Sequence, residues 1–490
     1  MEPTLNMPML LAMTAGYFVL LLLLSRVTGR RRDNDAFFRA GRRSPWWAVA
    51  FGMIGASVSG VTFVSVPGMV SVSQMTYLQT CMGFVLGYAA VAFILLPVYY
   101  RLNLTSIYTY LARRFGLASY RTGASFFFVS KLIGASIRLY LVCFILQEMV
   151  FARSGVSFGL TVFIVLLLIW LYTRNSGIST IVWSDCLQTV VLLSALVLII
   201  AQVCRHLGLS PGEAVSVVRG SPLSRVFVFD DVGSRQYFWK QFVSGIFIVI
   251  VMTGLDQDMM QKNLTCKTLR QSQLNMCVNG CLYLPVNLLF LALGVLLYHF
   301  CDVMQVTPPA SGDALLPSLC SSGVLGQASL ALFTIGIVAA AFSSADSAMT
   351  SLTTCFCVDL MRRPDDERLR RWVHPAIGLC FFLFIMLVRA LNNTSVIDAV
   401  YTVCSYTYGP LLGLFAFGLL TRRMPRERWV PFICLVSPLV CYAADQLVRH
   451  WTDYRFGYEL LMCNGLLTFL LLLLSSAKLG TDDARGHGHV

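Results

Sequence analysis

Apolar stretches about as long as a bilayer crossing recur along the whole of this chain. Of its 490 residues, 57% are hydrophobic and only 12% are charged, which excludes a soluble globular domain of this size. A helix needs roughly 20 apolar residues to cross a bilayer, and the sequence lacks the alternating pattern of a membrane β-barrel. Because lipid cannot satisfy backbone polar groups, these stretches predict an all-α polytopic membrane protein. We expect thirteen spans, at 7–25, 47–70, 77–99, 124–150, 157–173, 180–203, 237–256, 275–299, 328–357, 373–391, 396–420, 429–448 and 457–476.

The basic residues between these spans predict the orientation of the chain. Cytoplasmic loops carry an excess of Lys and Arg, and the loop after the first span is rich in arginine. With that loop inside, alternation places 26 of the 37 basic residues on the cytoplasmic side and 9 outside. The pattern predicts an outside N-terminus and a cytoplasmic C-terminus. It also explains the net charge of +13 by topology and attraction to anionic lipid, so no nucleic-acid partner is expected.

A polar stripe interrupts the apolar ninth span. Ala340, Ser343, Ser344 and Ser347 stand at i, i+3, i+4 and i+7, so they share one helix face, and Asp346 lies beside them. A carboxylate at membrane depth is costly unless it meets a cation, a partner or water. Oxygen ligands on one face suit a small hard cation, so the stripe predicts an ion site.

The second span has the composition of a broken helix. Small and hydroxyl residues gather at its middle, around Ser57, Ser59 and Gly60, and Pro67-Gly68 follows as a helix breaker. An unwound backbone frees carbonyl groups that can coordinate Na⁺ and helix ends that can hold substrate. Ser244-Gly245 occupies a comparable place in the seventh span, which favours an inverted repeat of spans 2–6 and 7–11.

Several charged residues lie inside or next to the spans. Arg138 is too deep to reach the interface easily, so it needs an anion, which could be a protein carboxylate or a substrate carboxylate. Asp185 is read either as a charge that reaches the interface or as a sodium ligand. Lys131 is expected to reach the cytoplasmic interface, and Asp256 and Asp258 are expected to be cytoplasmic helix-end charges.

These motifs resemble the sodium:solute symporter family, which includes sodium/galactose, proline, pantothenate and sialic acid transporters. The resemblance covers nearly the whole chain and implies a leucine-transporter-type fold, with a 5+5 inverted repeat and extra flanking helices. It rests on the segments 37–47 and 59–68, Trp183-Ser184-Asp185, Asp256-Gln257 with Gln261-Lys262, the stripe from Ser343 to Ser347, and the segment 408–413.

The resemblance also implies site residues. A main sodium site would use carbonyls of Gly55, Val58 and Ala340 and hydroxyls of Ser343 and Ser344. A second sodium site would use Asp185, Asp346 and Ser347, with Ser343 as a further hydroxyl. Asp346 departs from the family pattern, which has a hydroxyl there, and this second carboxylate could tighten sodium binding, admit a proton or pair with a base. The candidate substrate contacts are Ser59, Thr62, Gln79 and Arg138, where Arg138 matches the arginine with which sialic acid transporters hold the substrate carboxylate.

The expected organisation follows from the spans and the implied repeat. It comprises 1–46 as an extra N-terminal transmembrane helix with a basic cytoplasmic loop, 47–203 as the first repeat, 204–236 as an extracellular loop, 237–420 as the second repeat, 421–476 as two C-terminal transmembrane helices, and 477–490 as a cytoplasmic tail.

The sequence thus predicts a transporter rather than an enzyme. We expect a sodium-coupled secondary active symporter that imports a small organic solute by alternating access, with a carboxylate such as sialic acid considered first. A sodium/sugar, inositol or amino-acid symporter, a proton-coupled transporter and a transporter-like sensor remain open. The expected cofactor is Na⁺, the expected partners are the solute and membrane lipid, and the expected state is a monomer in a bacterial cytoplasmic (inner) membrane.

Overall fold

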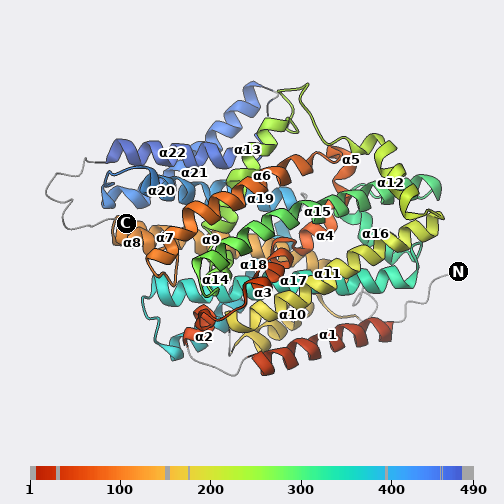
Figure 1. The fold of residues 1–490 in the computed structure, drawn as a ribbon, viewed down its shortest axis with the longest axis horizontal. Coiled ribbons are helices and arrows are strands. Elements are labelled where there is room, and N and C mark those ends of the chain that lie inside the picture. Colours follow the sequence, from red (N-terminus) through yellow and green to blue (C-terminus); the bar gives the residue numbers. More distant parts are fainter. Residues whose placement is uncertain are drawn as a thin grey trace.

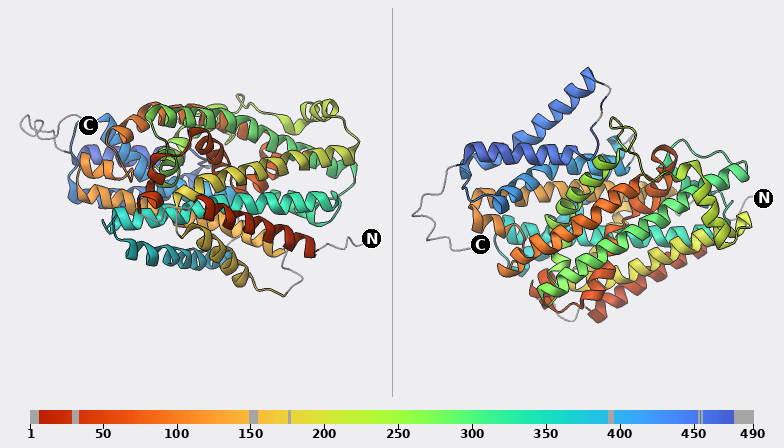
Figure 2. Two further views of the ribbon diagram at one scale, coloured as in Figure 1. Left: turned by 60° about the horizontal axis from the view of Figure 1, so that its bottom comes forward. Right: turned by 45° about the horizontal axis from the view of Figure 1, so that its top comes forward.

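The computed structural model describes residues 7–28, 34–148, 155–174, 177–391, 396–452, 454 and 456–476. The regular elements in this part of the chain are helices, and the longest of them lie side by side along one axis of the molecule (Figure 1). The two further views in Figure 2 show the same alignment. The first prediction, an all-helical bundle, is therefore confirmed.

Helices lie in each of the thirteen predicted intervals. Within the described ranges, seven helices are individually long and apolar enough to cross a membrane, or up to nine if each of two bent pairs is one span. Four shorter apolar helices add to these. In chain order the helices are α1 (Met7–Thr28), α3 (Trp46–Ser57) with α4 (Gly60–Gly68), α6 (Tyr77–Ala90) with α7 (Leu96–Arg101), α9 (Leu117–Leu146), α10 (Phe158–Thr173), α11 (Ile178–Leu207), α13 (Phe238–Val249) with α14 (Gln257–Asn263), α15 (Leu269–Val303), α17 (Gly326–Thr354), α18 (Glu367–Leu391), α19 (Val396–Thr407) with α20 (Gly409–Leu420), α21 (Val430–Trp451) and α22 (Leu460–Ser475).

Short helices lie at the two ends of this bundle. α2 (Asn34–Arg39) and α8 (Thr109–Arg114) lie toward one end, whereas α5 (Val70–Ser73), α12 (Pro211–Gly220) and α16 (Leu315–Ser321) lie toward the other (Figure 1). α12 begins with a capping box, in which Ser210 and Glu213 bond to each other's backbone N–H groups. α2 and α8 contain part of the arginine-rich segments that are predicted to lie on the cytoplasmic side.

The second span is broken, as its composition predicts. α3 and α4 meet at an angle of 52° across Val58 and Ser59. Val58 has φ −83° and ψ 79°, outside the helical region, and Ser59 is extended. Two residues in the middle of the span thus leave the helical hydrogen-bond ladder.

The seventh span is also broken, but not where we predicted. The bend of 70° separates 238–254 from α14, about ten residues after Ser244-Gly245. Asp256 produces it by capping α14, since its Oδ1 accepts hydrogen bonds from the backbone N–H groups of Asp258 (2.8 Å) and Met259 (3.4 Å). Ser244-Gly245 does not mark the break, because Gly245 serves a close helix crossing instead.

Gly245 lets two helices cross closely. A Cβ on Gly245 would overlap the carbonyl oxygen of Thr80, and a Cβ on Gly83 would overlap that of Phe242. The backbones of α6 and α13 are thus in direct contact, which only glycine permits.

We predict that Gly83→Ala destabilises the protein by about 1–3 kcal/mol, because the added methyl group pushes α6 away from α13. Thermal unfolding in detergent measures the effect. Gly159→Ala is the matched control, since the nearest atom to its new Cβ would be 3.9 Å away. Equal stability of the two variants would contradict the close crossing.

Candidate ion and substrate sites

Glycines bring the broken helix against α11. A Cβ on Gly52 would come within 2.8 Å of the Asp185 Cβ, and one on Gly55 would overlap the Thr189 hydroxyl. α3 therefore lies directly on the face of α11 that carries Asp185. Gly55 and Val58 end the first half of the span, where carbonyl groups no longer meet a following turn.

The stripe of α17 faces this break. Gly60, the first residue of α4, is close enough that its Cβ would lie 3.9 Å from the Ala340 Cβ. Ser343 is fully buried, and the buried Ser344 hydroxyl has no hydrogen-bond partner in the described part of the chain. A small cavity touches Gly60, Arg138 and Ser344 together.

This arrangement fits a hard cation. Backbone carbonyls at a helix end and an unpartnered hydroxyl oxygen are the donor types that Na⁺ takes, and leaving them buried without a partner is costly. The structure thus brings the stripe of Ala340, Ser343 and Ser344 against Gly60, two residues after Val58, with Gly55 one turn before the break. Their role as sodium ligands stays a prediction.

The residues of the possible second site already have protein partners. The Lys262 ammonium lies 2.8 Å from Asp185 Oδ2, and both side chains are 1% exposed. The Ser343 hydroxyl donates to Asp185 Oδ1 at 2.6 Å. Asp346 accepts from Tyr172 (2.7 Å) through Oδ2, and from the backbone N–H (2.5 Å) and hydroxyl (3.1 Å) of Ser347 through Oδ1.

Lys131 is paired inside the protein, so its predicted position at the interface is wrong. It is 7% exposed, and its ammonium lies 3.1 Å from Asp256 Oδ2 and 2.7 Å from Asp258 Oδ2. Asp256 also accepts a hydrogen bond from the Tyr408 hydroxyl at 2.8 Å. The two aspartates are buried rather than cytoplasmic helix-end charges, because the bend at Leu255 folds α14 into the bundle.

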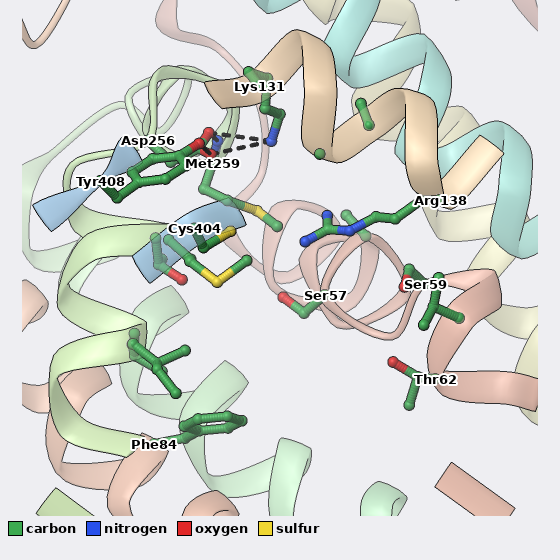
Figure 3. Close-up of a pocket in the computed structure, with 18 of the residues that line it drawn as sticks. Ser57, Ser59, Thr62, Phe84, Lys131, Arg138, Asp256, Met259, Cys404 and Tyr408 are labelled. Atoms are coloured by element: carbon green, nitrogen blue, oxygen red, sulfur yellow. Dashed lines mark hydrogen bonds and ion pairs between the residues drawn. The ribbon is translucent and has the colours of Figure 1, made fainter. Parts of the chain in front are cut away.

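A central cavity lies between the two breaks (Figure 3). Ser59 and Thr62 line it from the broken second span, and Arg138 lines it from α9. Gln79 lies elsewhere: it is fully buried, donates to the Gln236 carbonyl at 2.9 Å and accepts from the Val228 N–H at 3.2 Å. Those bonds fasten the 204–236 loop to α6, so the structure separates Gln79 from the other three substrate candidates.

Arg138 is the uncompensated cation of this cavity. Its guanidinium points into the space beside Ser57 and Ser59 (Figure 3). No carboxylate oxygen in the described ranges lies within 4.0 Å of it, whereas Lys131, on the same helix, has the carboxylates of two aspartates within that distance. Of the two anions that the sequence left open, a carboxylate from the described part of the protein is therefore not at ion-pair distance.

Sequence reasoning assigned no role to Lys262 or Tyr172. Lys262 lies on α14, and α14 was not expected inside the bundle because the seventh span was predicted to end at residue 256. A signal was present: Gly254 before a helix-capping Asp256 marks a helix start, from which Asp258 and Lys262 follow one turn apart at i and i+4. Their ion-pair distance is 4.0 Å.

Comparison with known proteins agrees with this architecture. A model of the "Sodium:solute symporter family" matches residues 37–427. The chain is 26% identical over 431 residues to the human sodium/iodide cotransporter, covering 82% of this chain and 65% of that protein. It is 25% identical over 447 residues to the sodium/sialic acid symporter NanT of Aliivibrio fischeri, covering 88% and 85%.

The fold has a solved counterpart. A substrate-bound, outward-open Na⁺-coupled sialic acid symporter matches it with a TM-score of 0.82 at 21% sequence identity, over 96% of this chain and 99% of the other. The matched family segment, 37–427, takes in the broken second span, the capped bend and the serine stripe. The chain therefore belongs to the sodium:solute symporter family, as a sodium-coupled membrane transporter and not an enzyme.

Proposed function

We propose that this chain imports a small organic anion, a carboxylate such as a sialic acid, together with Na⁺. The observation that carries the proposal is Arg138, a cation in the central cavity without a protein counter-ion in the described ranges. Arg138 is partly buried, and a carboxylate that binds its guanidinium in a bidentate pair would compensate its charge there. The substrate would supply that carboxylate.

The start of α4 adds to the same recognition. α4 begins at Gly60, so the backbone N–H groups of Gly60, Val61 and Thr62 have no hydrogen-bond acceptor within the helix. The positive end of the helix dipole therefore faces the cavity that Ser59, Thr62 and Arg138 line. An anion between Arg138 and this helix end would receive hydrogen bonds from both.

The alternatives that remained open are less favoured by this cavity. A neutral sugar or inositol would leave Arg138 unpaired. A zwitterionic amino acid would need a carboxylate for its ammonium group, and Asp256 and Asp258 are engaged by Lys131. Iodide and sialic acid, named for two relatives, are both anions, which supports an anionic substrate here.

Sodium would bind where the break meets the stripe. Its ligands would be carbonyls of Gly55, Val58 and Ala340 and hydroxyls of Ser343 and Ser344. Because one small cavity touches both Ser344 and Arg138, the ion and the anion would lie in adjoining spaces. Sodium bound first would hold α4 against α17 and favour the outward-open state, and the bundle would then rock to release both inward.

The finer topology is part of the proposal. We propose thirteen crossings, an outside N-terminus, a cytoplasmic C-terminus and two inverted repeats, with the domain limits given by the sequence. The two bent spans, five apart in the predicted order, support the repeat. Arg39 of α2 and the arginine pair Arg113-Arg114 of α8, at one end of the bundle, support the orientation. A monomer in a bacterial inner membrane, with lipid and without nucleic acid as partner, completes the proposal.

Uptake into proteoliposomes over a panel of solutes tests the function. We expect radiolabelled N-acetylneuraminate or another carboxylate to accumulate under an inward Na⁺ gradient, and galactose, inositol and proline not to. Replacing Na⁺ by choline or by a proton gradient should abolish accumulation. Uptake of a neutral sugar alone, or uptake indifferent to Na⁺, would reject the proposal.

Arg138→Gln should raise the carboxylate concentration that gives half-maximal uptake by about 10- to 100-fold, since a charge-assisted pair contributes roughly 1.5–3 kcal/mol. Arg138→Lys should retain part of the affinity because it keeps the charge but loses the bidentate geometry. Arg121→Gln, an exposed position on the same helix, is the control. Unchanged affinity in Arg138→Gln would dispose of the anion contact.

Ser344→Ala should raise the Na⁺ concentration for half-maximal uptake by about tenfold or more, because a buried ligand to a charge is lost. Ser343→Ala should act in the same direction. The Ser351 hydroxyl bonds the Ala348 carbonyl of its own helix, so Ser351→Ala should leave the Na⁺ concentration for half-maximal uptake unchanged. Wild-type sodium dependence in the double variant Ser343→Ala/Ser344→Ala would reject the site.

A further inference from the structure

The residues expected to form a second sodium site do not fit a free ion. Asp185 is the carboxylate on which that site depends. One of its oxygens faces the Lys262 ammonium, and the other accepts a hydrogen bond from the Ser343 hydroxyl. Asp346 accepts hydrogen bonds from Ser347 and from the Tyr172 hydroxyl. By contrast, the Ser344 hydroxyl, at the main site, has no hydrogen-bond partner among the residues that the structure describes.

We propose that the Lys262 ammonium is a built-in cation that takes the place of a second sodium ion at Asp185, so that the protein binds a single Na⁺. This inference rests on the proposed function, because it concerns the ion stoichiometry of the same transport cycle. An ammonium 2.8 Å from a carboxylate in a site that is 1% exposed supplies the charge that a second sodium would supply.

The charges around Lys262 support this assignment. Its ammonium lies between Asp185 and, at 4.0 Å, Asp258, which is itself paired with Lys131. A sodium ion at Asp185 would have to displace the ammonium or lie beside it, and two like charges in a buried site repel strongly. Displacement of the ammonium is unfavourable, because the Lys262 side chain is 1% exposed and its charge would lose Asp185 without gaining water.

Ser343 connects the built-in cation to the ion that moves. Its hydroxyl proton points at Asp185, so the lone pairs of the same oxygen remain available to a cation at the stripe. The Lys262–Asp185 pair thereby orients a sodium ligand without touching the sodium, as outer-shell partners do at other metal sites. One Na⁺ carried with a monovalent anion also moves no net charge, so this arrangement predicts electroneutral transport.

Equilibrium binding of ²²Na⁺ to the purified full-length protein, counted as sites per molecule, tests the inference without a solute. The wild type should bind one Na⁺, and Ser344→Ala should lose most of that binding. Lys262→Met should bind two, because the vacated carboxylate takes an ion. Lys262→Arg, which keeps the charge, should bind one.

If Lys262→Met alone does not fold, the double variant Lys262→Met/Asp185→Asn replaces it in the binding measurement, since the double variant removes both charges of the pair. It should bind one Na⁺. Two sites in the wild type, or loss of the only site in the double variant, would overturn the inference, as would a folded Lys262→Met with one site. No sodium binding in the wild type would instead refute the proposed function, so the two failures are distinguishable.

Discussion

A helix that stops halfway across a membrane leaves backbone groups that lipid cannot satisfy, and this constraint underlies the rest of the structure. The break at Val58 and Ser59 puts carbonyls on one side and N–H groups on the other, in the middle of the bundle. The helices of the candidate ion site lie around it: α11 faces its first half, α17 faces the start of its second half, and α9 lines the cavity beyond it. The second break, capped by Asp256, folds α14 into the same region.

Charge pairing decides which buried groups remain available for ligands. Lys131 and Lys262 meet aspartates within 3.1 Å and are thereby neutralised inside the protein. Arg138 meets none at that distance in the described ranges, and Ser344 has no partner. The unpartnered cation and the unpartnered hydroxyl touch one small cavity, which makes a coupled anion and sodium ion the simplest complement to both.

The features predicted correctly from sequence are those with local causes. Apolar length specified the helices, and the spacing of Ala340, Ser343 and Ser344 placed them on one buried face. The errors concern long-range partners. Ser244-Gly245 has the composition of a break, yet it serves a close crossing with α6, and nothing near Lys131 in sequence shows that Asp256, 125 residues later, neutralises it. Gln79 is polar within a membrane helix because it holds the 204–236 loop.

The most direct test of the account is a cryo-EM structure in saturating NaCl at a resolution that shows ions. We predict one cation density between the Val58 carbonyl and the Ser343 and Ser344 hydroxyls, with the Lys262 ammonium still on Asp185. Density at Asp185 with Lys262 displaced, or no density where the break meets the stripe, would contradict it.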